Sequence, residues 1–351
     1  MPPSAITVAG RTLGPGLPCF IIAEAGVNHN GSLELAIRLV DAAAEAGADA
    51  VKFQTFQADR LVTAQAPRAE YQRRNTGTGG SQLELLRALE LGPETHRQLQ
   101  AHCRSRGILF LSSPFGEASA DLLEALDVPL FKVPSGELTN HPFLTHLARK
   151  GRPLILSTGM ASLGEVESAL GVIQAAGAPP VALLQCVSCY PASARDANLR
   201  AMDTLAAAFQ VPVGYSDHTE GIAVSLAAVA RGACILEKHI TLDRRLPGPD
   251  QQVSIDPPEL AALVAGIRTV EAALGDGRKR PAPAEQEAMA VARKSLVAAA
   301  ALPAGTVLGP THFAVKRPGT GLPPAMLTFL VGRRLRRAVA EGDLLSLDDL
   351  D

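Results

Sequence analysis

The sequence lacks a long apolar run, a dominant charge and a regular cysteine pattern. No apolar stretch approaches the roughly 20 residues that a membrane-spanning helix needs, because glycine, proline or a charged residue interrupts the longest ones. Lysine and arginine number 33 against 35 aspartates and glutamates, so the formal net charge is −2 and no tail carries one sign. We therefore expect no membrane and no nucleic-acid partner, and instead a small-molecule substrate or a second copy of the chain.

Cysteine is also scarce. Five cysteines form an odd set in a chain of 351 residues, and the start of the sequence has no basic segment followed by an apolar one, as a secretory leader would. This pattern predicts a cytoplasmic protein. Cys186 and Cys189 form a C-x-x-C pair, but no second pair accompanies it, so redox or zinc chemistry there is disfavoured.

Short apolar segments alternate with amphipathic ones between about residue 20 and residue 275. Such alternation is typical of parallel strands joined by crossover helices. Most of the apolar segments are continuous, as in strands that are buried on both faces. We therefore predict a closed (β/α)₈ or TIM barrel of the α/β class, with strands at 20–23, 50–53, 108–111, 130–133, 154–156, 181–184, 212–215 and 234–237.

Helical periodicity fills the intervals between these strands. Ser32 and Ser162 occupy N-cap positions, and Glu165 completes a capping box with Ser162. Residues 6–13 are typical of a small hairpin, which we expect to plug the barrel floor. The predicted helices lie at 33–46, 93–106, 117–126, 163–176, 199–209, 222–231 and 260–274.

A polar, basic stretch rich in glycine and proline follows the last helix and marks a domain boundary. We predict a barrel domain with its N-terminal hairpin at 1–275, a linker at 276–286 and a second domain at 287–351. The second domain has short strand-like segments and Gly-containing turns. A core of this size is marginal alone, so we expect it to dock on something larger.

Polar side chains stand at the carboxyl ends of the predicted strands, where barrels of this type place their active sites. Lys52 and Lys132 lie inside strands, and a buried lysine is costly unless a counter-charge compensates it. Two of them predict a bound anion; pairing with a carboxylate such as Glu24 or Glu137 is the alternative. Further strand-end residues, several of them donors suited to a phosphate or carboxylate, are Gln54, Ser135, Ser157, Thr158, Gly159, Ser188, Tyr190, Ser216 and Glu237.

His218 and His239 end two neighbouring strands. Period-two geometry turns His218 to the same side as Ser216, and His239 to the same side as Glu237. Two imidazoles at adjacent strand ends are able to share a divalent ion and leave positions open for water and a substrate oxygen. The pair predicts a metal site; a hydrogen-bonded core role is the alternative for either histidine alone.

Several segments, in order along nearly the whole chain, resemble the sialic acid synthase family, whose members condense phosphoenolpyruvate with N-acetylmannosamine or a related hexose. They are AEAGVNHNG at 23–31, VKFQ at 51–54, YQRRNTG at 71–77, KVPSGE at 132–137, LSTGM at 156–160, GYSDHT at 214–219 and EKH at 237–239. VKRPGTG at 315–321 resembles the antifreeze-like domain of that family. The resemblance implies a TIM barrel followed by a small C-terminal antifreeze-like (SAF, β-clip) domain.

The resemblance also implies a role for each matching residue. A divalent ion, Mn²⁺ or alternatively Mg²⁺ or Co²⁺, would lie on His218 and His239. Glu24 is the candidate for activating water, with Glu137 and Glu237 as rivals. Phosphoenolpyruvate would be bound by Lys52, Lys132, Ser135, Ser157, Ser188 and Ser216, and the sugar by Gln54, Asn75, Glu137, Tyr190, Asp250 and Arg317, the last from the partner subunit of a domain-exchanged homodimer.

Two positions depart from the family pattern. Many relatives have His after the residue matched by Asp250, where this chain has Gln251, and some have Asn in place of Ser188. The first departure leaves the acceptor open between N-acetylmannosamine, which gives a sialic-type acid, and a 2,4-diacetamido hexose, which gives a legionaminic-type acid. We expect Asn75 and the Gln251 region to decide between them.

Two other functions compete. A barrel aldolase would use Lys132 or Lys52 as a Schiff-base nucleophile on pyruvate. A carbohydrate- or ice-binding protein would explain the antifreeze-like segment, but it leaves the inward lysines and the histidine pair without a role.

Overall fold

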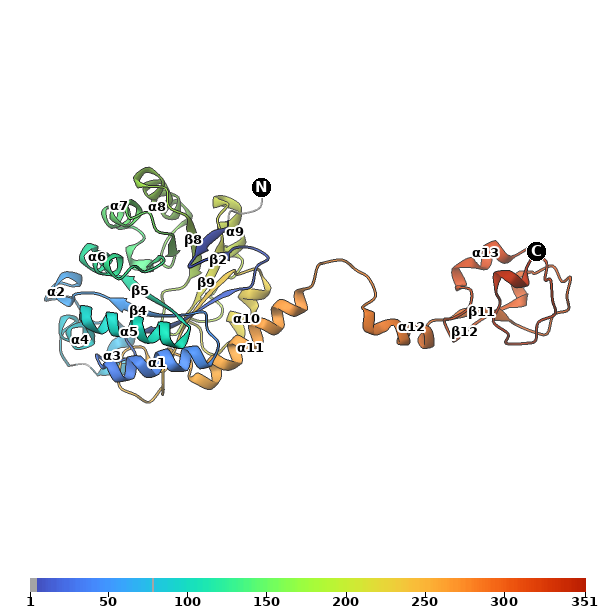
Figure 1. Cartoon of the computed structure of the whole chain (residues 1–351), viewed down its shortest axis with the longest axis horizontal. Coiled ribbons are helices and arrows are strands. Elements are labelled where there is room, and N and C mark those ends of the chain that lie inside the picture. Colours follow the sequence, from blue (N-terminus) through green and yellow to red (C-terminus); the bar gives the residue numbers. More distant parts are fainter. Residues whose placement is uncertain (1–4, 78) are drawn as a thin grey trace. The chain divides into compact units, whose positions relative to one another are not determined.

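The computed structural model of the chain describes residues 5–77 and 79–351. Its contacts separate two units, Met1–Gly275 and Asp276–Asp351 (Figure 1). The predicted linker, 276–286, falls at the start of the second unit.

The first unit is built on eight parallel strands in the order β5-β4-β3-β10-β9-β8-β7-β6. The two ends of this order, β5 and β6, lie side by side, so the sheet curls into a near-closed barrel. The predicted TIM barrel is therefore confirmed. The strands are β3 (Phe20–Gly26), β4 (Ala50–Thr55), β5 (Leu109–Pro114), β6 (Phe131–Val133), β7 (Leu154–Ser157), β8 (Val181–Cys186), β9 (Val213–Asp217) and β10 (Ile235–His239).

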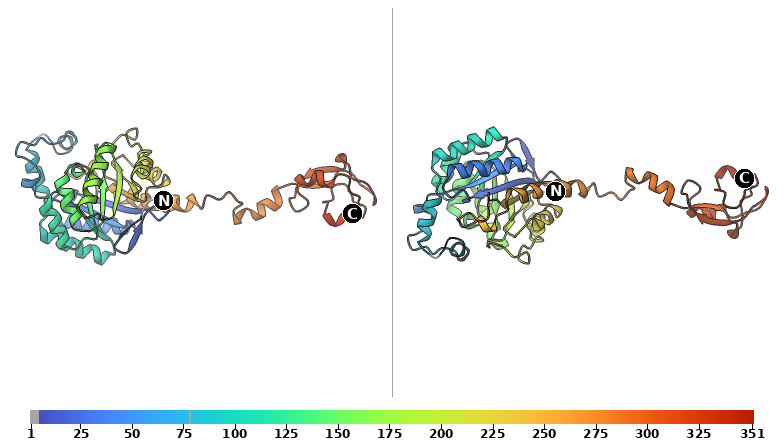
Figure 2. Two further views of the ribbon diagram at one scale, coloured as in Figure 1. Left: turned by 90° about the horizontal axis from the view of Figure 1, so that it is seen from above. Right: turned by 90° about the horizontal axis from the view of Figure 1, so that it is seen from below.

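Helices surround the strands (Figure 2). Ser32 and Ser162 cap their helices as predicted, and Glu165 closes the capping box. One barrel helix was not predicted: α7 starts with the polar Asn140 cap and a histidine, and is only nine residues long. The outer helices are α1 (Leu33–Glu45), α5 (Pro93–Arg106), α6 (Glu117–Ala125), α7 (His141–Arg149), α8 (Leu163–Ala176), α9 (Ala201–Phe209), α10 (Ala223–Ala230) and α11 (Pro257–Leu274).

The connection between β4 and α5 carries three further short helices that the sequence did not predict. They are α2 (Ala58–Leu61), α3 (Glu70–Thr76) and α4 (Gln82–Leu89). No side chain of α3 is buried, so no apolar periodicity marks it. These helices extend the wall above one part of the barrel mouth.

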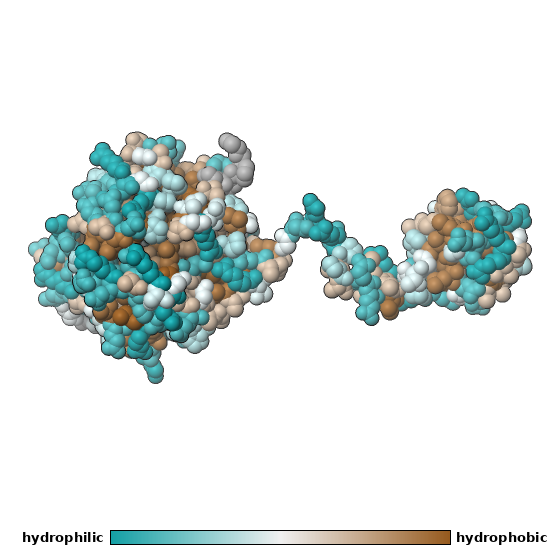
Figure 3. Space-filling model, in the orientation of Figure 1, coloured by the Kyte–Doolittle hydropathy of each residue, from teal (hydrophilic) through white to brown (hydrophobic). Residues whose placement is uncertain are grey.

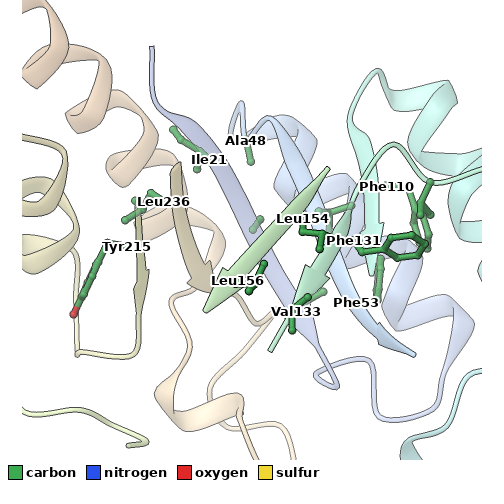
Figure 4. Packing of buried hydrophobic residues seen from close by; sticks show 14 of the residues in the cluster. Ile21, Ala48, Phe53, Phe110, Phe131, Val133, Leu154, Leu156, Tyr215 and Leu236 are labelled. Carbon is green, nitrogen blue, oxygen red and sulfur yellow. The ribbon is translucent and has the colours of Figure 1, made fainter. Parts of the chain in front are cut away.

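The core has two layers, because successive residues of each strand face opposite sides. In β4, Val51 and Phe53 pack outward against the helices, whereas Lys52 and Gln54 face the interior. Phe53 stacks on Phe110 of β5 with ring centroids 5.9 Å apart (Figure 4). The outer layer therefore fixes which strand residues reach the barrel mouth.

The barrel floor is closed by the predicted hairpin, β1 (Ile6–Val8) and β2 (Arg11–Leu13). Ile6, Val8 and Leu13 are buried in one cluster with interior strand residues such as Ile155 and Ile235. The packing of the hairpin against the interior of the barrel is as expected.

The second unit has its own small core, in which Leu296, Leu308, Leu330 and Leu335 are buried. Strand β11 (Ser295–Ala298) pairs antiparallel with β12 (Phe313–Lys316). Two short helices, α12 (Gln286–Ala292) and α13 (Leu327–Leu330), accompany them. Among the described residues of both units, short 3₁₀ turns lie at Ser135–Glu137, Gln251–Val253, Pro283–Glu285, Pro310–His312, Pro324–Met326 and Leu347–Asp349.

The visible face of the barrel unit is mostly polar (Figure 3). Figure 3 shows hydrophilic residues over most of the visible face of the barrel unit, with hydrophobic residues in small patches between them. Within the described parts of the chain, no helix combines the length and apolar character needed to cross a bilayer.

Candidate active site

A cavity of about 360 Å³ lies at the carboxyl ends of the strands. Period-two alternation brings the predicted strand-end side chains into it from all around the barrel. Thirteen of the predicted residues line it: Glu24, Lys52, Gln54, Lys132, Ser135, Ser157, Ser188, Tyr190, Ser216, His218, Glu237, His239 and Asp250.

Four buried charges form the floor of this cavity. Lys52 Nζ lies 2.6 Å from Glu24 Oε2, and Lys132 Nζ lies 3.1 Å from Glu237 Oε1. Lys52 Nζ is also 3.7 Å from Glu237 Oε2, so the two pairs form one cluster. Each lysine thus pairs with a carboxylate, which is the alternative interpretation of the lysines: Lys52 pairs with Glu24 as expected, and Lys132 pairs with Glu237 and not with Glu137. The cluster avoids the large cost of an isolated buried charge.

The two carboxyl groups have different acidities. Burial raises the pKa of Glu24 to about 7, although the charge of Lys52 works against it. Burial acts in the same direction on Glu237, but Lys132 and Lys52 outweigh it and hold the pKa of Glu237 at about 2. Glu237 is therefore an anion at neutral pH, while Glu24 is able to exchange a proton there, which suits an acid–base group.

Hydroxyl groups and one glycine form a cradle beside the lysines. The backbone N–H of Gly159 donates to Ser135 Oγ at 3.0 Å. Ser157 Oγ is buried without a hydrogen-bond partner among the described residues. A Cβ at Gly159 would lie 2.3 Å from Ser188 Oγ and 2.8 Å from Ser135 Oγ, so the three residues approach one another as only glycine allows. The cradle offers several donors to one anion.

The two predicted metal ligands face each other across the cavity. The rings of His218 and His239 have centroids 5.3 Å apart. His218 Nδ1 lies 2.7 Å from the carbonyl oxygen of Val187, a contact that fixes Nδ1 as the protonated nitrogen and leaves Nε2 as an electron-pair donor. His239 Nδ1 is buried and, in the described structure, has no hydrogen-bond partner.

These features fit a divalent ion held by two imidazoles. A metal lies about 2.1 Å from each imidazole nitrogen, so rings at this separation are able to share one ion. No group of three or more His, Cys, Asp and Glu side chains in residues 5–77 and 79–351 is arranged as a metal cage. The remaining coordination positions would therefore go to water and substrate oxygens, as in an open catalytic site.

Asp250 reaches the cavity from the loop that follows β10. Its side chain is buried, and Oδ1 finds no hydrogen-bond partner within the described residues. Burial raises the pKa of Asp250 to about 6, against the opposing influence of His218. Gln54 Nε2 donates to Glu24 Oε1 at 3.3 Å, so Gln54 is joined to the charged cluster. A polar ligand is expected to satisfy the free carboxylate oxygen.

Three predicted residues do not line the cavity. Glu137 is partly exposed on the turn after β6, where Asn140 donates to its Oε2 at 2.7 Å. Asn75 of α3 donates to the carbonyl oxygen of Pro249 at 2.6 Å. Arg317 is exposed in the second unit, where its Nε donates to the carbonyl oxygen of Ala292 at 3.1 Å. Their substrate contacts remain predictions.

Gln251 and His29 are buried outside the cavity lining. Gln251 Nε2 donates to the carbonyl oxygen of Asn28 at 3.0 Å, and its Oε1 accepts from Thr241. Gln251 thus ties the Asp250 loop to the loop after β3. His29 packs near Phe53, with centroids 6.1 Å apart, and burial lowers its pKa to about 4.

Several lining residues were missed from the sequence. Ser113 accepts a hydrogen bond from Lys52 Nζ at 2.9 Å. Its signal was present: β5 continues past Leu111 to Pro114, and alternation from the inward Leu111 points Ser113 inward. Other lining residues lie on elements with no such pattern or on an apolar wall: Val27, Tyr71, Gln72, Leu85, Leu86, Leu89 and Phe115.

Comparison with known proteins adds an independent line of evidence. Residues 39–279 match the NeuB family and residues 293–351 match the SAF domain. The chain is 47% identical to the N,N'-diacetyllegionaminic acid synthase of Legionella pneumophila over 342 residues, which cover 96% of each chain. It is 39% identical to human N-acetylneuraminate-9-phosphate synthase, covering 97% of this chain and 95% of that one.

A solved structure is similar as well. The N-acetylneuraminic acid synthetase of Leptospira borgpetersenii, determined in complex with citrate, superimposes with a TM-score of 0.73 at 37% identity. The match covers 82% of this chain and 95% of that protein.

Proposed function

The chain belongs to the NeuB family of sialic-acid-type synthases, and we propose that it condenses phosphoenolpyruvate with an N-acetylated amino hexose and water to give a nine-carbon acid and phosphate. The observation that carries the proposal is the placement of the Lys52–Glu24–Lys132–Glu237 cluster and the His218–His239 pair in one cavity. The cluster with the two lysines suits an anionic donor substrate, and the histidine pair suits an acceptor substrate that carries an oxygen atom.

Phosphoenolpyruvate would occupy the lysine side of the cavity. Its phosphate and carboxylate need cationic and hydroxyl donors, and Lys52, Lys132 and the serine cradle supply both.

The sugar aldehyde would lie at the histidine pair. His218 and His239 would hold a divalent ion, which when bound supplies Lewis-acid polarisation of the aldehyde oxygen. Tyr190 lies against His218, with ring centroids 4.2 Å apart, and Asp250 offers a free carboxylate oxygen to a sugar hydroxyl or amide. These side chains orient the acceptor toward the lysine cluster.

The reaction follows from this arrangement. C3 of phosphoenolpyruvate attacks the aldehyde carbon, a carbon–carbon bond forms, and positive charge develops at C2. Glu237, an anion at neutral pH, lies where it stabilises that charge. Glu24 removes a proton from the water that adds to C2, and this proton balances the alkoxide formed from the aldehyde oxygen, which becomes a hydroxyl group. The C2–O bond to phosphate then breaks, the remaining proton of the added water leaves with phosphate, and C2 becomes the ketone of the keto acid.

A 2,4-diacetamido hexose is the acceptor that we favour, with a legionaminic-type acid as the product. The support is the higher identity to a diacetyllegionaminic acid synthase, 47%, than to the human N-acetylneuraminate-9-phosphate synthase, 39%. N-acetylmannosamine is the second candidate.

A domain-exchanged homodimer completes the proposal. Arg317 is exposed in the second unit, and a sugar contact by this residue would come from the partner subunit.

Phosphate release tests the proposal. The purified protein is mixed with phosphoenolpyruvate, Mn²⁺ and either the 2,4-diacetamido hexose or N-acetylmannosamine. Phosphate is expected only when sugar is present, with loss of activity in EDTA and recovery with Mn²⁺. A Schiff-base aldolase would instead ignore EDTA and be trapped covalently by borohydride with pyruvate.

A further inference from the structure

Tyr71 is a lining residue with no role in the chemistry described so far. It lies on α3, and its ring stacks on Tyr190 with centroids 5.0 Å apart and an interplanar angle of 26°. Tyr190 in turn lies against His218, with centroids 4.2 Å apart. The three rings form a continuous series that leads from the predicted metal ligand toward the outer part of the cavity.

Two contacts hold Tyr71 and its helix, α3, in place. The phenol of Tyr71 interacts with the carboxyl group of Asp250. Asn75, which lies four residues further along the helix, donates from Nδ2 to the carbonyl oxygen of Pro249 at 2.6 Å. Both partners belong to the loop after β10. The helix therefore has a defined position over the cavity although none of its side chains is buried.

The wall near α3 is apolar. Leu85 and Leu86 of α4 line the same cavity, and both are only partly buried, so they present aliphatic surface to it. A binding site for a fully hydroxylated sugar gains little from such surface, whereas an acyl methyl group gains from burial against aromatic and aliphatic side chains. The lysines and histidines would surround the reacting end of the acceptor. The apolar wall would therefore contact the part of the acceptor that is remote from its aldehyde.

We propose that Tyr71, together with Leu85 and Leu86 of the same cavity, is a specificity-determining residue that binds the acyl substituent of the acceptor remote from the aldehyde. This inference rests on the proposed condensation and deepens it, because it names the part of the substrate that the wall selects. The ring supplies the contact surface. Stacking on Tyr190 keeps the ring in its orientation.

Three variants separate contact from packing. Tyr71→Ala removes the ring, Tyr71→Phe keeps the ring and removes the hydroxyl, and Arg73→Ala changes an exposed residue of the same helix as a matched control. For each full-length protein, kcat/KM is measured for the 2,4-diacetamido hexose and for N-acetylmannosamine, and KM is measured for phosphoenolpyruvate. Thermal unfolding shows whether each variant is folded.

Tyr71→Ala is expected to lower kcat/KM about ten-fold more for the diacetamido hexose than for N-acetylmannosamine, the effect of one lost apolar contact. KM for phosphoenolpyruvate should change less than about two-fold, Tyr71→Phe should retain most of the selectivity, and Arg73→Ala should behave as the unmodified protein. Equal losses for the two sugars, or no loss, would overturn the inference while leaving the condensation in place. An unmodified protein that releases phosphate with neither sugar would overturn both.

Discussion

His218 and His239 come from neighbouring strands and face each other with ring centroids 5.3 Å apart, and the carbonyl oxygen of Val187 fixes the tautomer of His218. The residue before each histidine, Asp217 or Lys238, points to the opposite side of the sheet. There the two form a buried ion pair, with 3.0 Å between Lys238 Nζ and Asp217 Oδ2. The alternation of side chains along the two strands thus places the histidines on the side of the cavity and the supporting ion pair on the opposite side.

His239→Ala is expected to abolish turnover with little change in the free energy of unfolding, because the side chain faces the cavity instead of the core. Binding of Mn²⁺, followed by the electron paramagnetic resonance signal of the free ion, should weaken by at least about ten-fold. A variant that retains metal-dependent turnover would exclude this histidine as a ligand.

Gly159→Ala probes the anion cradle. The added methyl group would lie 2.3 Å from Ser188 Oγ and 2.8 Å from Ser135 Oγ, so both hydroxyls must rotate away. KM for phosphoenolpyruvate should rise about ten-fold or more, the equivalent of roughly one charge-assisted hydrogen bond, while KM for the sugar changes little. Steady-state kinetics with each substrate varied in turn decides the matter, and unchanged phosphoenolpyruvate binding would place the anion elsewhere.

Lys238→Met tests the ion pair behind the histidines. Lys238 and Asp217 have side chains that are 1% and 0% exposed, so the substitution leaves Asp217 as an uncompensated buried charge. The free energy of unfolding should fall by about 3 kcal/mol, measured by urea denaturation. Lys150→Met is the control: it removes a lysine paired with the more exposed Asp121 and Glu124, where about 1 kcal/mol or less is expected. Equal effects would contradict the role given to burial.

Arg317→Ala tests the exchanged dimer. Alone, it should raise KM for the sugar far more than KM for phosphoenolpyruvate. Arg317→Ala subunits are then mixed with His239→Ala subunits and allowed to reassociate. The mixture should regain activity, because each mixed dimer has one site in which both His239 and Arg317 are intact. With random pairing, about a quarter of the wild-type sites return. If Arg317 served its own barrel, mixing would restore nothing.

The barrel was predictable because most of its strands are continuous apolar runs and most of its helices carry caps and apolar periodicity. The positions of Lys52 and His239 followed from the same alternation, since Val51 and Leu236 had to face the helices. Ser113 was lost only because the strand was expected to end at residue 111, whereas β5 extends to Pro114.

The outer part of the cavity was not predictable in the same way. Helix α3 has no buried residue, so the sequence carries no periodic signal for it or for the placement of Tyr71. Asn75 and the Gln251 region stay the predicted determinants of the sugar, and the amides of Asn75 and Gln251 bond to backbone carbonyl oxygens. The pairing of Lys132 with Glu237 joins residues 105 positions apart, which local patterns do not encode.

The fate of the bridging oxygen of phosphoenolpyruvate tests the central claim most directly. The donor is labelled isotopically at the oxygen between C2 and phosphorus, and the protein is supplied with Mn²⁺ and the diacetamido hexose. We predict that the label leaves entirely with phosphate, in amounts equal to the nine-carbon acid and only when sugar is present. Label retained in the organic product, or phosphate released without sugar, would contradict the proposed condensation.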